Sequence, residues 1–143
     1  MRRRLSLVLG VLLLVPAGAG AAKTASPSFR SPSGNIRCFA GARVLHCAIA
    51  EADYAKTLQD RCMAGASVDW HGFELAAIGK GLFTCSGGIL YDPDTQTPHY
   101  PLLAYGRVWR QGGFTCISAL AGVTCHTRAG HGLFISRQSW RGF

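Results

Sequence analysis

Six cysteines constrain this chain more than any other feature of its sequence, because four of them lie in two segments of the same design. The segments are 36–47 (IRCFAGARVLHC) and 114–125 (FTCISALAGVTC), and each has two half-apolar runs around a turn of small residues. In both segments eight residues, 39–46 and 117–124, separate the two cysteines. This pattern is typical of a β-hairpin with one cysteine on each strand.

Hairpin geometry narrows the choice of cysteine pairs. Six cysteines allow fifteen connectivities, and the sequence alone does not choose among them. Opposed residues of a hairpin have a constant sum of residue numbers, so turns at 41–44 and 119–122 place the two cysteines of each segment opposite each other. Opposed Cα atoms lie about 4.5–5.5 Å apart, which a disulfide can bridge. We expect three disulfides: Cys38–Cys47, Cys116–Cys125 and, from the two cysteines that remain, Cys62–Cys85.

The N-terminal residues predict export. Three arginines at 2–4 precede an apolar run at 5–15, and Pro16 leads into the small-residue tract AGAGAA with an A-x-A site at Ala19 and Ala21. This is the layout of a secretory signal peptide, and the apolar run is shorter than the ~20 residues that span a bilayer. A retained membrane anchor is the alternative. We expect a signal peptide at 1–21, a flexible arm at 22–28 and a single disulfide-stapled β domain at 29–143, exported to the periplasm or the extracellular space, with no membrane span after signal removal.

Short apolar runs separated by glycine-rich turns predict the fold class. Besides the two hairpins, strands are expected near 68–75, 82–85, 107–110 and 133–136, whereas the proline-rich segment 91–101 is typical of an irregular loop. The segment 51–61 contains neither Gly nor Pro and repeats apolar residues at helical spacing. We predict a mainly β protein: a small disulfide-stapled barrel or sandwich of short antiparallel strands with one short helix at about residues 52–61.

The charge of the chain limits its partners. Loss of the signal peptide removes three of the 15 basic residues, which leaves 12 against 7 acidic residues and an excess of +5. Such an excess suits ordinary solubility or weak attraction to anionic polymers of the cell envelope, and it does not indicate nucleic acid. We expect a monomer whose partner is an unknown protein or an anionic envelope polymer.

The residues that could support catalysis do not form a recognisable motif. The five histidines match neither H-E-x-x-H nor any paired C-x-x-C arrangement, and all six cysteines are expected in disulfides, so we predict no metal, no cofactor and no catalytic residue. We predict an exported, non-enzymatic binding or interaction domain, with an inhibitor as one version. The alternative is a small envelope-acting hydrolase that uses His126 or His131 with an acid between Asp69 and Asp94.

Arginine and aromatic residues gather in the C-terminal half and predict a binding surface, because Trp and Arg are enriched at binding hot spots. The candidate binding residues are Arg107, Trp109, Arg110, His126, Arg128 and His131. Period-two alternation along 107–110 gives the other interpretation, in which Trp109 faces the core and its neighbouring arginines face solvent.

Several motifs along the chain resemble one family. The segments FRSPSGNIRC (29–38), LAYG (103–106) and GFTCIS…GVTC…GHGLFISR (113–137) resemble a family of small secreted bacterial proteins with an F-x-S-P-S-G-N-I-x-C opening and a G-H-G-F-type close. This chain has Leu133 where that close usually has Phe. The resemblance implies an exported, disulfide-bonded domain and supplies no catalytic residue.

Overall fold

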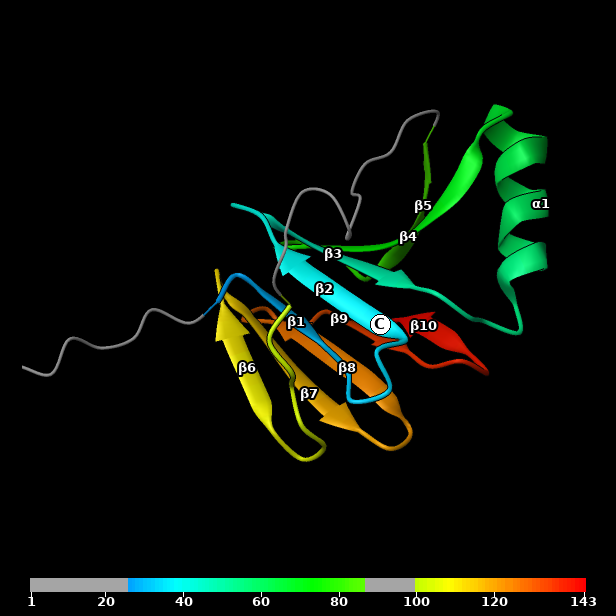
Figure 1. The fold of residues 1–143 in the computed structure, drawn as a ribbon. Coiled ribbons are helices and arrows are strands. Elements are labelled where there is room, and N and C mark those ends of the chain that lie inside the picture. The colour runs from blue at the N-terminus through cyan, green and yellow to red at the C-terminus, as the bar shows by residue number, and fades with distance from the viewer. Residues whose placement is uncertain (1–25, 87–99) are drawn as a thin grey trace, which may run out of the picture.

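The computed structural model describes residues 26–86 and 100–143, which form two five-stranded antiparallel sheets and one helix (Figure 1). Sheet A contains β1 (Ser28–Arg30), β2 (Ile36–Ala40), β3 (Val44–Ile49), β4 (Asp69–Ala76) and β5 (Leu82–Ser86). Sheet B contains β6 (Val108–Gln111), β7 (Phe114–Ala119), β8 (Gly122–Thr127), β9 (Gly132–Ile135) and β10 (Trp140–Gly142). The signal peptide, most of the expected arm and nearly all of the proline-rich loop lie outside the described residues.

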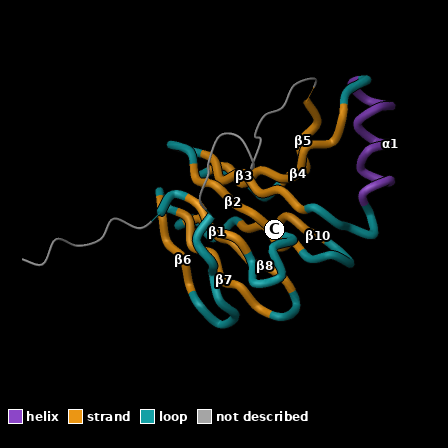
Figure 2. Tube along the Cα trace, viewed as in Figure 1, coloured by secondary structure: helices purple, strands orange, loops and turns teal. Residues whose placement is uncertain are grey.

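Each sheet is a meander in which neighbouring strands are consecutive in the chain (Figure 2). The helix α1 (Ala55–Ala66) connects β3 to β4 and lies beside the β4–β5 end of sheet A (Figure 1). The prediction of a mainly β, disulfide-stapled fold with one short helix is therefore confirmed, and the arrangement is a sandwich. No helix of the described residues is long and apolar enough to cross a membrane.

The cysteines pair as the hairpin geometry predicts. The three disulfides are Cys38–Cys47, Cys62–Cys85 and Cys116–Cys125, and no cysteine is free. Both hairpin disulfides join residues that oppose each other directly in the strand register, with Cα–Cα distances of 4.1 and 4.0 Å.

The two sheets repeat one design. Each hairpin occupies the second and third strand of its sheet, and each disulfide has a large apolar residue next to it on the flanking strands. In sheet A the row is Phe29, Cys38, Cys47 and Phe73, and in sheet B it is Trp109, Cys116, Cys125 and Leu133. All eight of these side chains are buried.

These two rows meet at the centre of the sandwich. The Sγ atoms of Cys38, Cys47 and Cys125 all lie within 4.8 Å of one another, so the two hairpin disulfides pack face to face. The Phe29 and Trp109 rings pack beside them with their centroids 4.9 Å apart. These sulfurs are bonded to each other within the disulfides, so the cluster has no thiolate to offer a metal ion.

The helix begins and ends later than residues 52–61. The backbone N–H groups of Glu51 and Asp53 are already bound, the first to the Asn35 side chain (2.7 Å) and the second to the Arg137 carbonyl (2.9 Å), so the chain is held in a turn until Tyr54. At the other end the helix runs on through Gly65 and stops at Ser67, which has the left-handed φ of 54° common at helix C-termini. Tertiary hydrogen bonds thus set the start of the helix.

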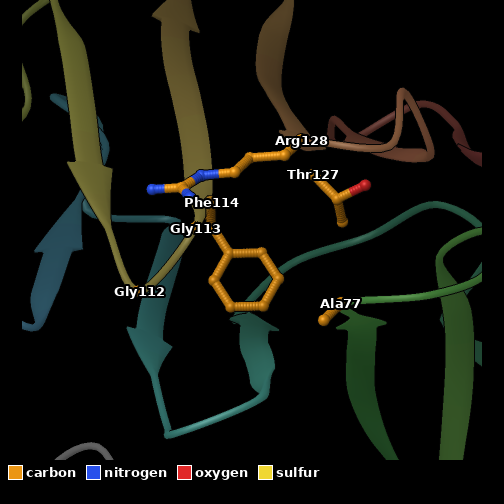
Figure 3. Close-up of a pocket in the computed structure, with 6 residues that line it drawn as sticks. All are labelled: Ala77, Gly112, Gly113, Phe114, Thr127 and Arg128. Atoms are coloured by element: carbon orange, nitrogen blue, oxygen red, sulfur yellow. The ribbon is translucent and has the colours of Figure 1, made fainter.

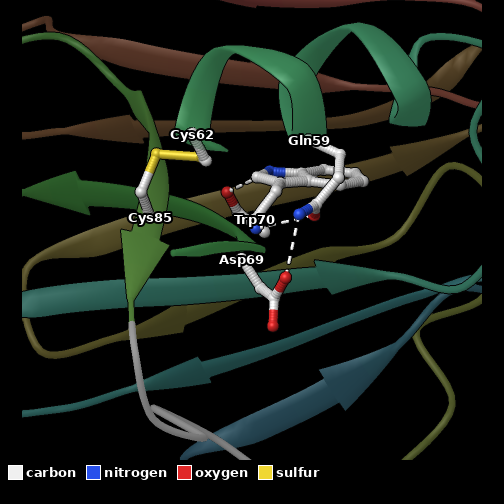
Figure 4. Close-up of a disulfide and its surroundings, with 6 residues drawn as sticks. Gln59, Cys62, Asp69, Trp70 and Cys85 are labelled. Carbon is white, nitrogen blue, oxygen red and sulfur yellow. Dashed lines mark hydrogen bonds between the residues drawn. A yellow bond between two sulfur atoms is a disulfide. The ribbon is translucent and has the colours of Figure 1, made fainter. Parts of the chain in front are cut away.

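The disulfide between Cys62 and Cys85 attaches α1 to β5 (Figure 4). Beside it the Gln59 side chain donates to the Asp69 carboxylate (2.8 Å) and accepts from the Trp70 backbone N–H (3.0 Å). The Trp70 indole N–H donates to the Gly72 carbonyl (2.9 Å), where β4 carries an irregularity in register between residues 70 and 73. The helix is therefore joined to sheet A by covalent and polar contacts.

Tyr54 ties the start of α1 to sheet B. Its hydroxyl donates to the Ser136 carbonyl (2.9 Å), just after β9, and its ring lies 6.2 Å from those of Trp70 and Phe73. Burial, and secondarily the nearby Asp53 carboxylate, raise the pKa of the Tyr54 phenol well above its usual range.

We predict that the two kinds of disulfide rank opposite to their loop lengths. In the loop-entropy model, closure of the 62–85 loop contributes about 3.4 kcal/mol and closure of the 116–125 loop about 2.7 kcal/mol. The second disulfide also fills the core, where methyl-sized voids cost about 1 kcal/mol each. In urea unfolding, the Cys116→Ala, Cys125→Ala variant should therefore lose more stability than the Cys62→Ala, Cys85→Ala variant. The reverse order would show that loop closure, and not sulfur packing, dominates.

We predict that Tyr54 limits stability in alkali. The folded chain keeps the phenol proton in a range where the unfolded chain, with a pKa of about 10, releases it. The stabilisation is therefore complete below pH 10 and falls as pH rises, by up to about 1.4 kcal/mol per pH unit for one proton. Urea unfolding between pH 7 and 11 should show a shallower alkaline decline for Tyr54→Phe, although this variant loses about 1 kcal/mol at pH 7 with the hydrogen bond. Equal slopes for both proteins would contradict the assignment.

Candidate binding surface

The outer face of sheet B is built by alternation along five strands in register. Because Trp109, Cys116, Cys125 and Leu133 point into the core, their neighbours along each strand point to solvent. One row of opposed residues across the sheet is Val108, Ile117, Thr124, Phe134 and Arg141. A second row is Arg110, Thr115, His126 and Gly132.

We call this surface the cationic face. It comprises the exposed or half-buried side chains of Val108, Arg110, Thr115, Ile117, Thr124, His126, Arg128, Phe134, Arg141 and Phe143. Val108, Ile117 and Phe143 are 41%, 36% and 42% exposed, so apolar groups lie among the cations at the surface. A face of this composition can contact a partner that carries both negative charge and apolar surface.

No carboxylate balances the cations of this face. Residues 100–143 include five arginines and no Asp or Glu, and the last acidic residue of the chain is Asp94. Arg137 pairs with Glu51 (3.5 Å) and Asp53 (3.4 Å), outside the face. The other four arginines of this half form no ion pair with a carboxylate of the described residues. They are Arg107, Arg110, Arg128 and Arg141.

The C-terminal residues complete the cationic face. The Arg141 guanidinium lies over the rings of Phe134 and Phe143, 5.9 and 5.4 Å from their centroids. The Phe143 ring covers Gly132, where a Cβ atom would collide with it, and it meets the His126 ring edge-on at 6.3 Å. The missing side chain at position 132 therefore makes room for an aromatic ring in the second row.

At the β6–β7 turn the cationic face ends in a hollow. A cavity of about 460 Å³ is lined by Ala77, Gly112, Gly113, Phe114, Thr127 and Arg128 (Figure 3). A neighbouring hollow of about 340 Å³ shares four of these residues and adds Arg110, Gln111 and Thr115. Figure 3 shows the Arg128 side chain reaching toward the two-glycine turn. Arg110 and Arg128, far apart in sequence, thus line one depression.

The structure brings together three of the six candidate binding residues, namely Arg110, His126 and Arg128. Trp109 is 8% exposed and faces the core, where its indole N–H donates to the Ser26 carbonyl (2.9 Å). Arg107 is exposed before the start of β6, and His131 is half-buried in the turn between β8 and β9.

Phe134, Arg141 and Phe143 belong to the face and were not predicted from the sequence. The signal that points to them is the absence of acidic residues after Asp94 in a segment that continues to the C-terminal aromatic residue.

The described residues do not assemble a catalytic pair from the predicted histidines. His46 on the outer face of sheet A lies 3.1 Å from the Glu74 carboxylate. Neither His126 nor His131 lies within 4.0 Å of a carboxylate in the part of the chain that the structure describes. Asp92 and Asp94, which were candidate acids, lie outside the described residues.

The S-P-S-G-N motif at 31–35 builds a structural turn. The Ser31 hydroxyl accepts from the Ile36 N–H (3.1 Å), and the Gly34 N–H donates to the Ser31 carbonyl (2.9 Å). The Asn35 amide donates to the Glu51 carbonyl (2.9 Å) and accepts from the Glu51 N–H (2.7 Å), which joins the start of β2 to the segment after β3. The side chains of Ser31 and Asn35 are therefore engaged in holding the chain together.

The fold and the surface together define a disulfide-linked β-sandwich with one flat cationic face. A family model described as a family of unknown function (DUF6636) matches residues 7–142, and the chain belongs to this family. No curated protein and no solved structure matches the chain.

We predict that Gly132→Ala destabilises the cationic face. The new methyl group would collide with the Phe143 ring and lie 2.9 Å from the Cys125 carbonyl, so the backbone or the ring must move. Overpacking of this kind costs about 1–3 kcal/mol, measured by urea unfolding. Gly65→Ala in α1 is the control, because no atom lies within 4 Å of its new methyl group and helix propensity favours Ala. Equal stabilities for the two variants would contradict the close contact at Gly132.

Proposed function

We propose that this chain is an exported, non-enzymatic binding domain that holds an anionic glycan polymer of the cell envelope on its cationic face. The observation that carries the proposal is the charge of sheet B: Arg110, Arg128 and Arg141 share one face, and residues 100–143 contain no acid. Uncompensated arginines on one surface create a positive potential that attracts anions over about a Debye length.

The shape of the face supports an extended ligand. Five strands spaced ~4.8 Å apart make a surface about 19 Å across, and arginines lie at both edge strands. Sites for small molecules are usually concave and mostly apolar, whereas this face is flat and opens into a hollow at one end. A polymer with repeated negative charges can reach the guanidinium groups at both sides.

Export is supported by two independent features. The N-terminal sequence has the signal-peptide layout at 1–21, and the three disulfides are typical of proteins that fold in an oxidising compartment. On this proposal residues 22–28 are a linking arm, and 29–143 act as one monomeric domain in the periplasm or outside the cell. The hydrolase alternative has less support, because His126 and His131 lack a carboxylate partner among the described residues.

Charge reversal tests the proposed face with a matched control. The Arg128→Glu, Arg141→Glu variant and the Arg43→Glu, Lys80→Glu variant make the same change in net charge, but the second alters exposed turns of sheet A. Co-sedimentation with purified peptidoglycan and with lipopolysaccharide, in separate arms, should show affinity at least about tenfold lower for the first variant than for the second. Binding of the unaltered domain should also weaken between 50 and 200 mM salt.

Thermal unfolding of both variants checks that each remains folded. Equal losses of affinity in the two variants would mean that net charge alone drives the association, and no saturable binding of the unaltered domain to either polymer would overturn the proposal.

A further inference from the structure

The strand β6 is an open sheet edge in the part of the chain that the structure describes. The outer edge of β1 is covered by the chain at 101–103, through hydrogen bonds from Arg30 N–H to the Pro101 carbonyl (3.0 Å) and from Leu103 N–H to the Arg30 carbonyl (2.9 Å). The edge of β10 is covered by Gly81, whose backbone touches Gly142 and donates to the Gly132 carbonyl (2.9 Å).

The two remaining edges differ. The strand β5 leads directly into residues that are not described. Within the described residues β6 pairs with β7 alone.

The register shows which backbone groups of β6 are open. The Ser118 N–H donates to the Arg107 carbonyl (3.3 Å), and Arg107 is thus in a hydrogen-bonded position opposite Ser118. Hydrogen-bonded pairs alternate with non-bonded pairs along an antiparallel ladder, so Val108 opposite Ile117 and Arg110 opposite Thr115 are non-bonded. The N–H and C=O groups of Val108 and Arg110 therefore point away from β7.

Charge determines which kind of strand can use these groups. Two copies of β6 paired with each other would bring two Arg107 and two Arg110 side chains together with no acid between them, which opposes self-association. The same arginines attract an acidic strand. On the outer face Val108 and Arg110 are two residues apart, so the matching strand has an apolar residue and an acidic residue with the same spacing.

We infer that β6 takes an extended acidic segment of a partner protein as a sixth strand of sheet B. Backbone hydrogen bonds to Val108 and Arg110 supply the pairing, and Arg107 and Arg110 supply the preference for carboxylates. This contact goes beyond the binding of an anionic polymer, because it uses the edge of the sheet rather than the cationic face.

A proline substitution separates the backbone contact from the side-chain contact. Val108→Pro removes an N–H that β7 does not use, whereas Val108→Ala shortens the side chain and keeps the N–H. The probe is a short, capped, fluorescein-labelled peptide of threonines with one Glu and one Val two residues apart, added to the full disulfide-bonded domain at low salt.

Fluorescence anisotropy should show saturable binding. We expect Val108→Pro to weaken it at least about tenfold, the effect of about 1.4 kcal/mol, and Val108→Ala to change it less than about twofold. A peptide with Lys in place of Glu should not bind.

Three results would overturn this inference: no binding of the acidic peptide, equal binding by Val108→Pro, or equal weakening by Val108→Ala. A peptide N-methylated on the nitrogens that face β6 tests the same hydrogen bonds on the unaltered domain, so the test stands even if the proline variant fails to fold. Loss of binding is expected, and retention would contradict the inference.

The two proposals fail separately. The Val108→Pro variant keeps every cation and should bind the envelope polymer as the unaltered domain does, whereas the Arg128→Glu, Arg141→Glu variant should lose the polymer.

Discussion

The contact between two disulfides at the centre of the sandwich is the constraint on which the rest of the structure depends. Each bond fixes the register of one hairpin, and a shift of one residue would turn every side chain of a strand to the opposite face. The contact of Cys38 and Cys47 with Cys125 also fixes which faces of the two sheets meet. Inner and outer positions of both meanders follow from this one arrangement, down to the burial of Trp109 and the exposure of Arg110.

The two sheets share a design but differ in charge. All five acidic residues of the described chain lie between positions 51 and 74, in α1, β4 and the turns next to them. There they balance neighbouring cations, as Asp60 does Lys56 (2.7 Å). Sheet B has no such residues, so its arginines face solvent without partners on an otherwise neutral surface. A scaffold held by disulfides can carry this unbalanced charge, because its stability does not depend on surface ion pairs.

Local patterns predicted the hairpins, their disulfides and most strands, because alternation and turn residues are features of short segments. The start of α1 was not predictable, since Asn35 and Arg137 occupy the N–H groups of residues that would otherwise be helical. The cationic face was predicted in part: Arg110 and Arg128 were found. Arg141 was missed because only the register across five strands places it in the same surface. Long-range pairing of this kind leaves no short-range signal.

Mapping of the bound surface by nuclear magnetic resonance tests the central claim most directly. The isotope-labelled domain, with its disulfides intact, would be titrated with soluble peptidoglycan fragments or lipopolysaccharide at low salt. The account predicts amide shift changes concentrated at Thr115, Thr124, His126 and Arg141 on the outer face of sheet B. Changes concentrated on the outer face of sheet A, around His46 and Glu74, or no changes at all, would contradict it.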